Sequence, residues 1–413
     1  MLKSIVFVVG SKIQWQNFIS LSPYLKKKKY KIHFVLLDNY ECKSSPIPKK
    51  DNGIKFSILE TSSPNKFLDF LFNRKFLKRF LPLFSLNIVW NKFLNNSNPN
   101  LVVFGVDHSI IHSYMIRVCN IKNIKTAVLQ DAYIPVKILK NGLVVSRTNF
   151  YLNKLGLLSR YLNLNLPYVP KPFKSSVNFI GLIGEEAKQS IDSKSTVSSK
   201  ISVVGSPRYE NFVRKANEYS IKSKSVIVNR NKNNIVFIQT NYDYLSFKFE
   251  HQQQQSLIWL CESIQNMKLK NTLMVNVYLH PGTQNIKEYK TIQNKFKNNL
   301  IIKTGGIKPS VIEKCHSCFT MGSTGIIDFY LCKIKCAVIV DPKIKNPLLI
   351  PGILNFGFPL INNDDKLFKF ITKKSYSIKN ITKFNSNKIA NFKPNWNSIE
   401  KTANWITSIV ESR

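Results

Sequence analysis

Residues 273–279 read L-M-V-N-V-Y-L, and His280-Pro281-Gly282 follow at once. The run is rich in residues that favour strands, while proline and glycine end a strand. This stretch therefore predicts a buried strand with an imidazole, His280, at its carboxyl end. In an open parallel sheet that end is where ligands bind.

A second strand-loop-helix pattern follows further along the chain. Residues 318–321 (C-F-T-M) predict a short strand, 322–325 (G-S-T-G) predict a turn, and Ile326 to Cys332 have helical spacing. Lys335 to Val340 predict the next buried strand. Two strand-helix units in succession indicate a parallel sheet.

The start of this second helix is a candidate phosphate site. Ser323 or Thr324 would cap the helix, and backbone N–H groups at a helix start attract anions. A monophosphate or a diphosphate would then lie between His280 and Ser323-Thr324.

The order of these elements, with Asp328 on the helix, resembles the C-terminal, donor-binding half of GT-B glycosyltransferases. It is similar in particular to bacterial surface-polysaccharide enzymes, CDP-glycerol glycerophosphotransferases and non-hydrolysing UDP-N-acetylglucosamine 2-epimerases. The resemblance implies that Asp328 takes the place of an acidic residue that binds the nucleotide ribose. Gly322 departs from the pattern, since many members carry a second serine there. The implied donor-binding residues are His280, Pro281, Gly322, Ser323, Thr324, Gly325 and Asp328.

The chain has 413 residues, 44% of them hydrophobic, which suits two domains of about 200 residues each. Its 61 basic and 23 acidic residues give a net charge of +38. Nucleic acid is disfavoured as a partner because no zinc-finger spacing or RNP-type aromatic motif is found. An anionic membrane surface, with an anionic donor and acceptor, explains the sign better. Genome composition is the open alternative, because Lys, Asn and Ile are abundant throughout.

No apolar run approaches the roughly 18 to 20 residues that span a bilayer. The apolar run Ile5–Val9 is too short for a secretory leader and predicts the first core strand. We therefore expect a cytoplasmic protein, peripheral on the inner face of the cell membrane.

Seven cysteines form no dense, even framework, which points to a reducing compartment. The pairs Cys315-x-x-Cys318 and Cys332-x-x-x-Cys336 have spacings that suggest zinc. Zinc is disfavoured because Cys318 and Cys336 fall inside predicted buried strands. We expect no metal and no cofactor, only a nucleotide-sugar co-substrate.

The N-terminal half also has the pattern of a parallel α/β domain. Gly10 is a lone glycine and does not indicate a dinucleotide site. The predicted strands are Ile5–Val9, Ile32–Leu37, Leu101–Val106, Thr126–Leu129, Phe179–Ile183 and Ile201–Val204.

Residues 66–94 interleave Phe and Leu with Arg and Lys, and Pro82 breaks or kinks any helix there. Such a segment suits a helix in a lipid headgroup region. Equally, Phe and Leu at helical spacing could face the core of the N-terminal domain. The sequence leaves both readings open.

Two N-terminal strands end in Asp107-His108 and in Gln130-Asp131. Carboxyl ends of parallel strands share one edge, so Asp107, His108 and Asp131 are expected at the interdomain cleft. An acceptor hydroxyl that attacks an anomeric carbon needs a general base, for which Asp131 is the candidate. The alternative is that Asp131 caps the next turn.

Residues 205–209 (G-S-P-R-Y) resemble the G-N-P-R-x-D signature that closes the N-terminal domain in these families. Arg208 is a candidate partner of phosphate, or forms a domain-closing ion pair. Thr240 is expected at the cleft after a strand at 235–239. The predicted organisation is an acceptor domain at 1–212, a linker at 213–232, a nucleotide-sugar domain at 233–397, and a helix at 398–413 that packs back toward the first domain.

The sequence thus predicts a GT-B protein with two Rossmann-like parallel-sheet domains that face each other across a cleft. The predicted function is a metal-independent glycosyltransferase of surface polysaccharide, with a glycan or lipid-linked acceptor and with Asp131 and His280 as catalytic residues. The His-Pro and Ser-Thr motifs, with an acid at 131, resemble those of transferases that use CMP-activated acidic sugars, and this resemblance favours such a donor. The alternatives are a CDP-polyol phosphotransferase, a UDP-N-acetylhexosamine 2-epimerase that uses Asp107 and Asp131, and a catalytically silent relative that binds polyanions.

Overall fold

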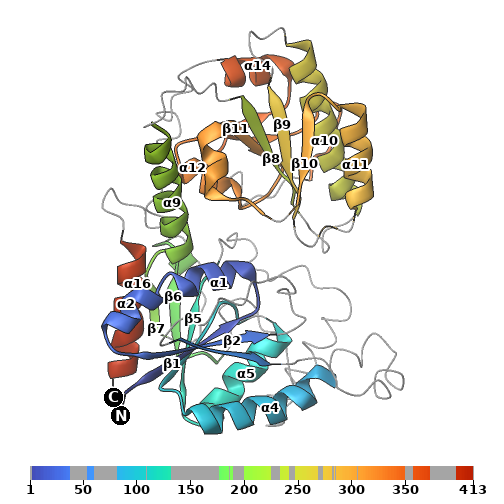
Figure 1. The fold of residues 1–413 in the computed structure, drawn as a ribbon. Coiled ribbons are helices and arrows are strands. Elements are labelled where there is room, and N and C mark those ends of the chain that lie inside the picture. The colour runs from blue at the N-terminus through green and yellow to red at the C-terminus, as the bar shows by residue number, and fades with distance from the viewer. Residues whose placement is uncertain are drawn as a thin grey trace. The chain divides into compact units, whose positions relative to one another are not determined.

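The computed structural model describes most of the chain, and its secondary structure forms two compact units (Figure 1). Unit 1 comprises Met1–Glu210 and Ser386–Arg413, and unit 2 comprises Asn211–Asn385. The described residues are 2–37, 54–59, 81–107, 109–131, 176–185, 187–188, 200–224, 233–240, 247–267, 273–280, 283, 285–304, 306–348, 357–372 and 397–412.

Unit 1 is built on a parallel sheet of seven strands in the order β3-β2-β1-β4-β5-β6-β7. The chain starts at the centre, proceeds to one edge, and returns to build the other, which is the doubly wound order of a Rossmann sheet. Its strands are β1 (Ser4–Val9), β2 (Lys31–Leu37), β3 (Ile54–Leu59), β4 (Leu101–Phe104), β5 (Lys125–Leu129), β6 (Phe179–Leu182) and β7 (Lys200–Val203).

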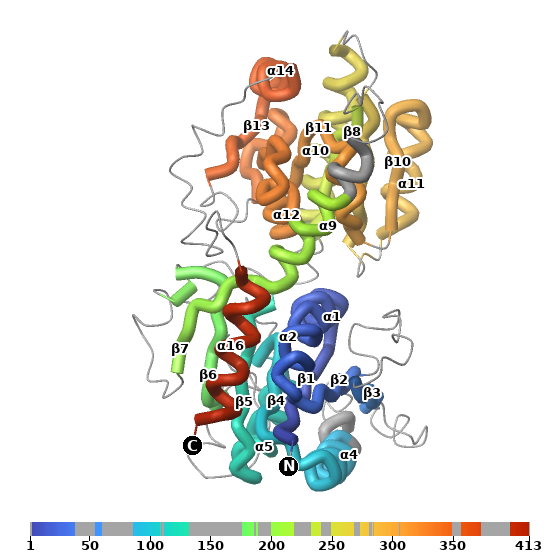
Figure 2. Tube along the Cα trace, turned by 60° about the vertical axis from the view of Figure 1, so that its left-hand side comes forward, coloured from blue at the N-terminus to red at the C-terminus, as the bar shows by residue number. Residues whose placement is uncertain are grey.

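Helices cover both faces of this sheet. On one face α1 (Lys12–Ile19), α2 (Ser22–Lys27) and α16 (Ser398–Glu411) bury Phe18, Leu25 and Ile406 against the strands. Figure 2 shows α16 alongside α2, which it contacts.

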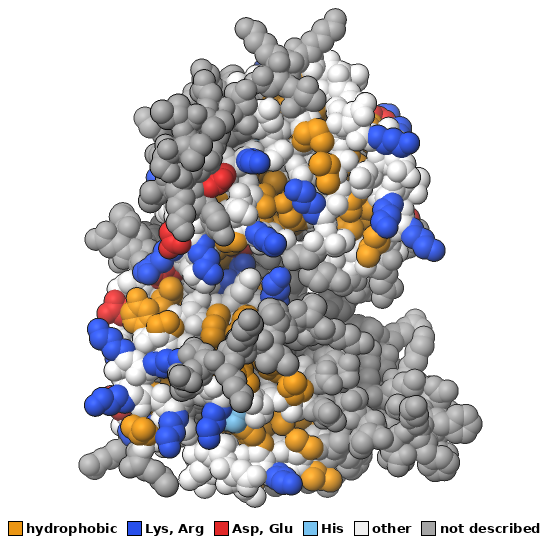
Figure 3. All heavy atoms as spheres, viewed as in Figure 1, with side chains coloured by type: hydrophobic (Ala, Val, Ile, Leu, Met, Phe, Trp, Pro, Cys, Tyr) orange, Lys and Arg blue, Asp and Glu red, His pale blue; other side chains and the backbone are white. Residues whose placement is uncertain are grey.

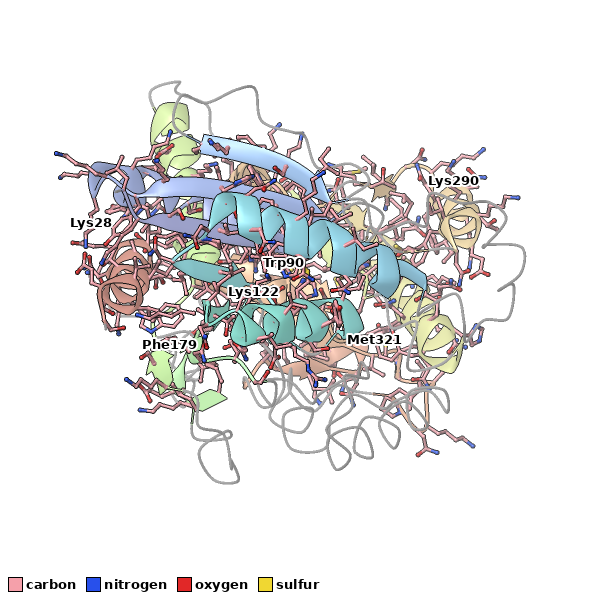
Figure 4. The ribbon with its side chains drawn as sticks, turned by 90° about the horizontal axis from the view of Figure 1, so that it is seen from below. Lys28, Trp90, Lys122, Phe179, Lys290 and Met321 are labelled. Atoms are coloured by element: carbon pink, nitrogen blue, oxygen red, sulfur yellow. The ribbon has the colours of Figure 1, made fainter. Side chains whose placement is uncertain are left out.

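On the other face lie α4 (Leu81–Ser97) and α5 (Ile110–Ile121). Trp90 reaches from α4 to α5, where its indole N–H donates to the carbonyl of Met115 at 3.3 Å (Figure 4). Because Leu86, Trp90 and Leu94 are buried, this part of the basic aromatic segment faces the core. Ile88 on the opposite side is 71% exposed. Residues 66–80 of that segment lie outside the described part.

Unit 2 repeats the design with six parallel strands in the order β10-β9-β8-β11-β12-β13. The strands are β8 (Asn234–Ile238), β9 (Met274–Tyr278), β10 (Leu300–Lys303), β11 (Cys315–Thr320), β12 (Lys335–Ile339) and β13 (Leu360–Ile361). The helical elements are α10 (Phe247–Asn266), α11 (Ile286–Lys295), a 3-10 turn η2 (Pro309–Lys314), α12 (Ile326–Leu331) and α14 (Asp364–Thr372). Leu257 of α10, Tyr289 of α11 and Leu367 of α14 share one hydrophobic core with the sheet.

The predicted α/β class with two parallel sheets is confirmed. The strands β3, β10 and β13, which lie at edges of their sheets, were not predicted from the sequence. The predicted linker at 213–232 overlaps α9 (Pro207–Lys224), which continues through its first part. Residues 225–232 lie outside the described part.

The G-S-P-R-Y stretch joins α9 to the C-terminal helix within unit 1. Gly205 has φ of 85°, and a Cβ atom there would lie 2.1 Å from the hydroxyl of Ser398. Pro207 begins α9, and the backbone N–H of Ile399 donates to the Glu210 carboxylate at 2.8 Å. The position thus requires both a left-handed backbone and no side chain, which only glycine satisfies at no steric cost.

We expect Gly205→Ala to destabilise the protein by about 1–3 kcal/mol, because alanine must adopt a left-handed backbone against Ser398. The free energy of unfolding in urea measures this cost. In the Ser398→Gly background the same substitution should cost less, because the steric part is relieved. Equal costs in both backgrounds would contradict the proposed close approach.

His33 of β2 is a half-buried histidine on the α4 side of unit 1. Its Nε2 lies 2.8 Å from the Ser57 hydroxyl, and its ring lies edge-on to Phe93 at 4.9 Å. Burial, together with the smaller effect of the nearby charge of Lys55, lowers the pKa of His33 from 6.5 to about 4. The folded protein therefore holds this imidazole neutral.

Between about pH 6.5 and pH 4 the unfolded chain binds a proton at His33 that the folded chain does not, so folding becomes less favourable as the pH falls. We expect His33→Gln to lose less stability than the wild type across this window. Chemical denaturation of both proteins at pH 7, 5.5 and 4.5 measures the difference. Parallel curves would show that His33 is protonated in the folded state.

Candidate functional site

The carboxyl ends of β9, β8 and β11 lie next to one another at one edge of the unit 2 sheet. His280 follows β9, Thr240 follows β8, and the 322–325 turn follows β11. The chain order reverses between β8 and β11, and ligands of open α/β sheets bind outside such a switch point. Three predicted site positions thus meet at one edge.

The His280 loop is fixed by a buried glutamine. The His280 backbone N–H and the Thr283 hydroxyl both donate to Gln239 Oε1, at 2.8 and 2.7 Å. The Thr283 N–H donates to the His280 carbonyl at 2.9 Å. The backbone is therefore held close to β8, while the His280 side chain is exposed.

Gln239 is one member of a polar network beneath this edge. Its amide nitrogen donates to Glu250 Oε2 at 3.3 Å, and the Gln253 amide donates to the same oxygen at 3.2 Å. Gln253 also pairs with the Thr240 backbone in both directions, at 2.8 and 3.1 Å. Burial raises the pKa of Glu250, while hydrogen bonds from Tyr289, Gln239 and Gln253 lower it.

The same face of α10 holds the loop after β12. Gln252 accepts from the N–H of Leu348 at 2.8 Å and donates to the Asn346 carbonyl at 3.1 Å. The Ser256 hydroxyl accepts from the Asp341 N–H at 3.0 Å. These residues were not predicted from the sequence. Their signal is a set of uncharged polar residues in the helix that follows β8.

The turn at 322–325 differs from the predicted anion site. Thr320 Oγ1 accepts from the N–H groups of Gly322 and Ser323, at 3.1 and 2.8 Å, and Ser323 Oγ accepts from Gly325 N at 3.3 Å. These three backbone donors are already engaged within the turn. Ser323 thus caps the turn, but α12 begins at Ile326 without a side-chain cap of its own. A phosphate here would meet side-chain hydroxyls rather than these N–H groups.

Of the remaining predicted donor-site residues, Asp328 is described by the structure and Pro281 is not. Asp328 is 4% exposed, and its carboxylate contributes, after burial, to raising the pKa of the Cys332 thiol to about 12. Contact with a ribose would require Asp328 to become exposed. Pro281 lies outside the described residues.

In unit 1, the predicted acidic residues follow β4 and β5. Asp107 is fully buried, Asp131 is half-buried, and His108 lies outside the described residues. Asp131 is held by two residues of α1 that the sequence analysis did not identify. Its carboxylate accepts from Gln14 Nε2 at 3.1 Å, and its carbonyl accepts from Asn17 Nδ2 at 3.3 Å.

Arg208 lies at the same edge of unit 1. Its backbone N–H donates to Asn17 Oδ1 at 2.9 Å, and its guanidinium stacks on the Tyr209 ring at 4.3 Å. Asn17 therefore connects Asp131 with the start of α9.

Among the described residues, no group of three His, Cys, Asp or Glu side chains is arranged to hold a metal ion. Cys318 and Cys336 are opposite each other on β11 and β12, and burial raises the pKa of Cys318 well above its usual range. These thiols are core residues. The described part of the chain also has no helix that is long and apolar enough to cross a bilayer.

We expect Gln239→Leu to destabilise the protein by about 1–3 kcal/mol, because the His280 N–H and the Glu250 carboxyl lose buried partners. Chemical denaturation measures the change. Gln254→Leu is a matched control, since the Gln254 amide donates to the exposed Glu288 at 2.6 Å, and it should change stability by less than about 0.5 kcal/mol. Equal effects of the two substitutions would argue against the network.

No family model and no curated protein sequence matches this chain. Solved structures do match its fold over nearly the full length. The Methanocaldococcus jannaschii UDP-GlcNAc 2-epimerase in complex with UDP-GlcNAc and UDP is 15% identical, with a TM-score of 0.53 and 99% of each chain covered. Arabidopsis thaliana UGT89C1 with UDP-L-rhamnose is 11% identical, with a TM-score of 0.56 and coverage of 99% and 100%.

Phytolacca americana UGT2, complexed with UDP-2-fluoro-glucose and pterostilbene, is 8% identical, with a TM-score of 0.54 and coverage of 99% and 100%. At these identities the likeness concerns the fold alone. Two doubly wound parallel sheets that match glycosyltransferases and epimerases along the whole chain constitute the GT-B fold.

Proposed function

We propose that this protein is a nucleotide-sugar-dependent glycosyltransferase with its donor site at the β9-β8-β11 edge of unit 2. The supporting observation is that an exposed His280, held by Gln239, follows β9, and that the hydroxyl-bearing 322–325 turn follows β11. These positions lie on either side of β8 at the carboxyl ends of the strands of a GT-B sheet. Proteins of this fold have been crystallised with UDP-sugars.

The chemistry requires stabilisation of a departing phosphate. When the acceptor hydroxyl attacks the anomeric carbon, the new C–O bond forms as the bond from that carbon to the phosphate oxygen breaks. Negative charge then grows on the nucleotide phosphate. An imidazolium at His280 and the hydroxyls of Ser323 and Thr324 would stabilise that charge without a metal ion.

Asp131 of unit 1 is the proposed general base. It would take the proton of the acceptor hydroxyl as the new bond forms. Hydrogen bonds from Gln14 and Asn17 hold its carboxylate and its backbone, which suits a group that must be fixed in orientation. Asp107 is buried, so it is the weaker candidate.

For the substrate class we propose a CMP-activated acidic sugar and a glycan or lipid-linked acceptor of surface polysaccharide. The acid at 131 and the His-Pro and Ser-Thr motifs support this choice through the resemblance of these motifs to such transferases. A CDP-polyol phosphotransferase is the nearest alternative.

The charge of +38 favours anionic partners. On the face shown in Figure 3, Lys and Arg side chains are spread over both units rather than gathered in one patch. This distribution fits attraction to an extended anionic membrane surface more than a localised binding groove.

A UDP-sugar 2-epimerase is the second candidate, favoured by the fold match to the Methanocaldococcus enzyme. An epimerase interconverts its UDP-sugar with no acceptor present. Product analysis without acceptor therefore separates the two functions.

We expect one of CMP, CDP, UDP and GDP to raise the melting temperature of the protein, because a ligand at 100 times its Kd stabilises by about 2.7 kcal/mol. His280→Ala should lose most of this shift. The control is His316→Ala, because His316 is the second residue of β11 and lies at the amino end of that strand, away from the proposed site.

A CMP shift supports the acidic-sugar transferase, a CDP shift the polyol phosphotransferase, and a UDP shift directs the next test to epimerisation. No shift with any nucleotide would contradict the proposed function. A shift retained in His280→Ala but lost in His316→Ala would contradict the proposed place of the site.

A further inference from the structure

Gln14 lies at the switch point of unit 1. The strand order β3-β2-β1-β4-β5 reverses between β1 and β4, and Gln14 is in the first turn of α1, directly after β1. A glutamine near the start of an amphipathic helix is ordinarily exposed, but Gln14 is 3% exposed. Its side chain is therefore directed into the sheet edge where a ligand of this fold would bind.

The Gln14 amide has one possible orientation. Its Oε1 accepts from the Gly10 N–H at 2.6 Å, and its Nε2 donates to Asp131 Oδ2 at 3.1 Å. In a flipped amide, the Nε2 donor would face the Gly10 N–H, which is also a donor. The Oε1 acceptor would then face Asp131 Oδ2, which is also an acceptor. The backbone after β1 thus decides which end of the amide meets the Asp131 carboxylate.

The end of β4 leaves room for the Gln14 side chain. A Cβ atom on Gly105, which follows β4, would lie 2.3 Å from Gln14 Cγ and 2.5 Å from its Cδ. Glycine at 105 therefore lets the Gln14 side chain cross the end of β4, which lies between β1 and β5, and reach Asp131. Gly10, Gly105 and Asp131, which lie far apart in sequence, all meet one amide.

Asn17, one turn further along α1, completes the support. It is fully buried and donates to the Asp131 carbonyl at 3.3 Å. The backbone and the carboxylate of Asp131 are thus each held by α1. Two fixed points on one residue restrict the rotation of its side chain.

We propose that Gln14 is the positioning residue that orients the Asp131 carboxylate at the switch point of unit 1. The inference rests on the proposed function, in which Asp131 accepts the proton of the acceptor hydroxyl. Because Gln14 donates a hydrogen bond to Oδ2, it favours the ionised, proton-accepting carboxylate. It touches neither donor nor acceptor and acts through Asp131 alone.

The test compares Gln14→Leu and Gln14→Glu with Gln16→Glu, a matched control on the same helix. We expect Gln14→Leu to lower kcat by up to about 100-fold with little change in the donor KM, because the base is misplaced while the donor site in unit 2 is intact. In Gln14→Glu a second carboxylate faces Asp131, so the acid limb of the pH–rate profile should move to higher pH. Gln16→Glu should leave both unchanged.

A readout that needs no activity is the pH titration of the Asp131 carboxyl carbon, followed by 13C NMR in the full chain and assigned with Asp131→Asn. Gln14→Glu should raise the titration midpoint, and Gln16→Glu should not. An unchanged midpoint in Gln14→Glu overturns the inference, whether or not transfer is observed. A raised midpoint in a protein that neither binds a nucleotide nor transfers a sugar would instead support the contact and reject the proposed function.

Discussion

The backbone groups directly after the end of a buried parallel strand need hydrogen-bond partners, and in both units glutamine side-chain amides provide them. Gln14 pairs with Gly10, Gln130 accepts from the Ile183 N–H at 2.9 Å, and Gln239 accepts from the His280 N–H. A glutamine both donates and accepts, so one side chain can satisfy a strand end and a second group beside it. The candidate catalytic residues occupy their places because these amides fix the loops that carry them.

The strands of both sheets could be predicted from the sequence where they are central, because a strand buried on both faces is a continuous apolar run. The outer strand β3 reads I-K-F-S-I-L and buries only its ends, so its pattern is weaker. The sites could be predicted only as single positions at strand ends. Their amide partners could not, since nothing local distinguishes the buried Gln14 from the more exposed Gln16 two residues further along. The 322–325 turn shows the same limit, because the engagement of its N–H groups depends on Thr320.

Transfer and epimerisation on one fold differ in the acidic groups that unit 1 must supply. A transferase needs one oriented base and room for an acceptor, whereas a 2-epimerase needs several acidic groups around the sugar. At the described edge of unit 1 the half-buried carboxylate is Asp131, while Asp107 is enclosed by the core. This asymmetry between the two acids supports the transferase.

The C-terminal helix determines when unit 1 can complete its fold during translation. Unit 2 is inserted between the two segments of unit 1, and α16 supplies Ile399, Ala403 and Ile406 to the core of the earlier segment. During translation, the face of the unit 1 sheet that α16 covers remains exposed to solvent until the ribosome has synthesised the whole of unit 2 and α16. Until then, nascent unit 1 exposes apolar surface that a chaperone could recognise.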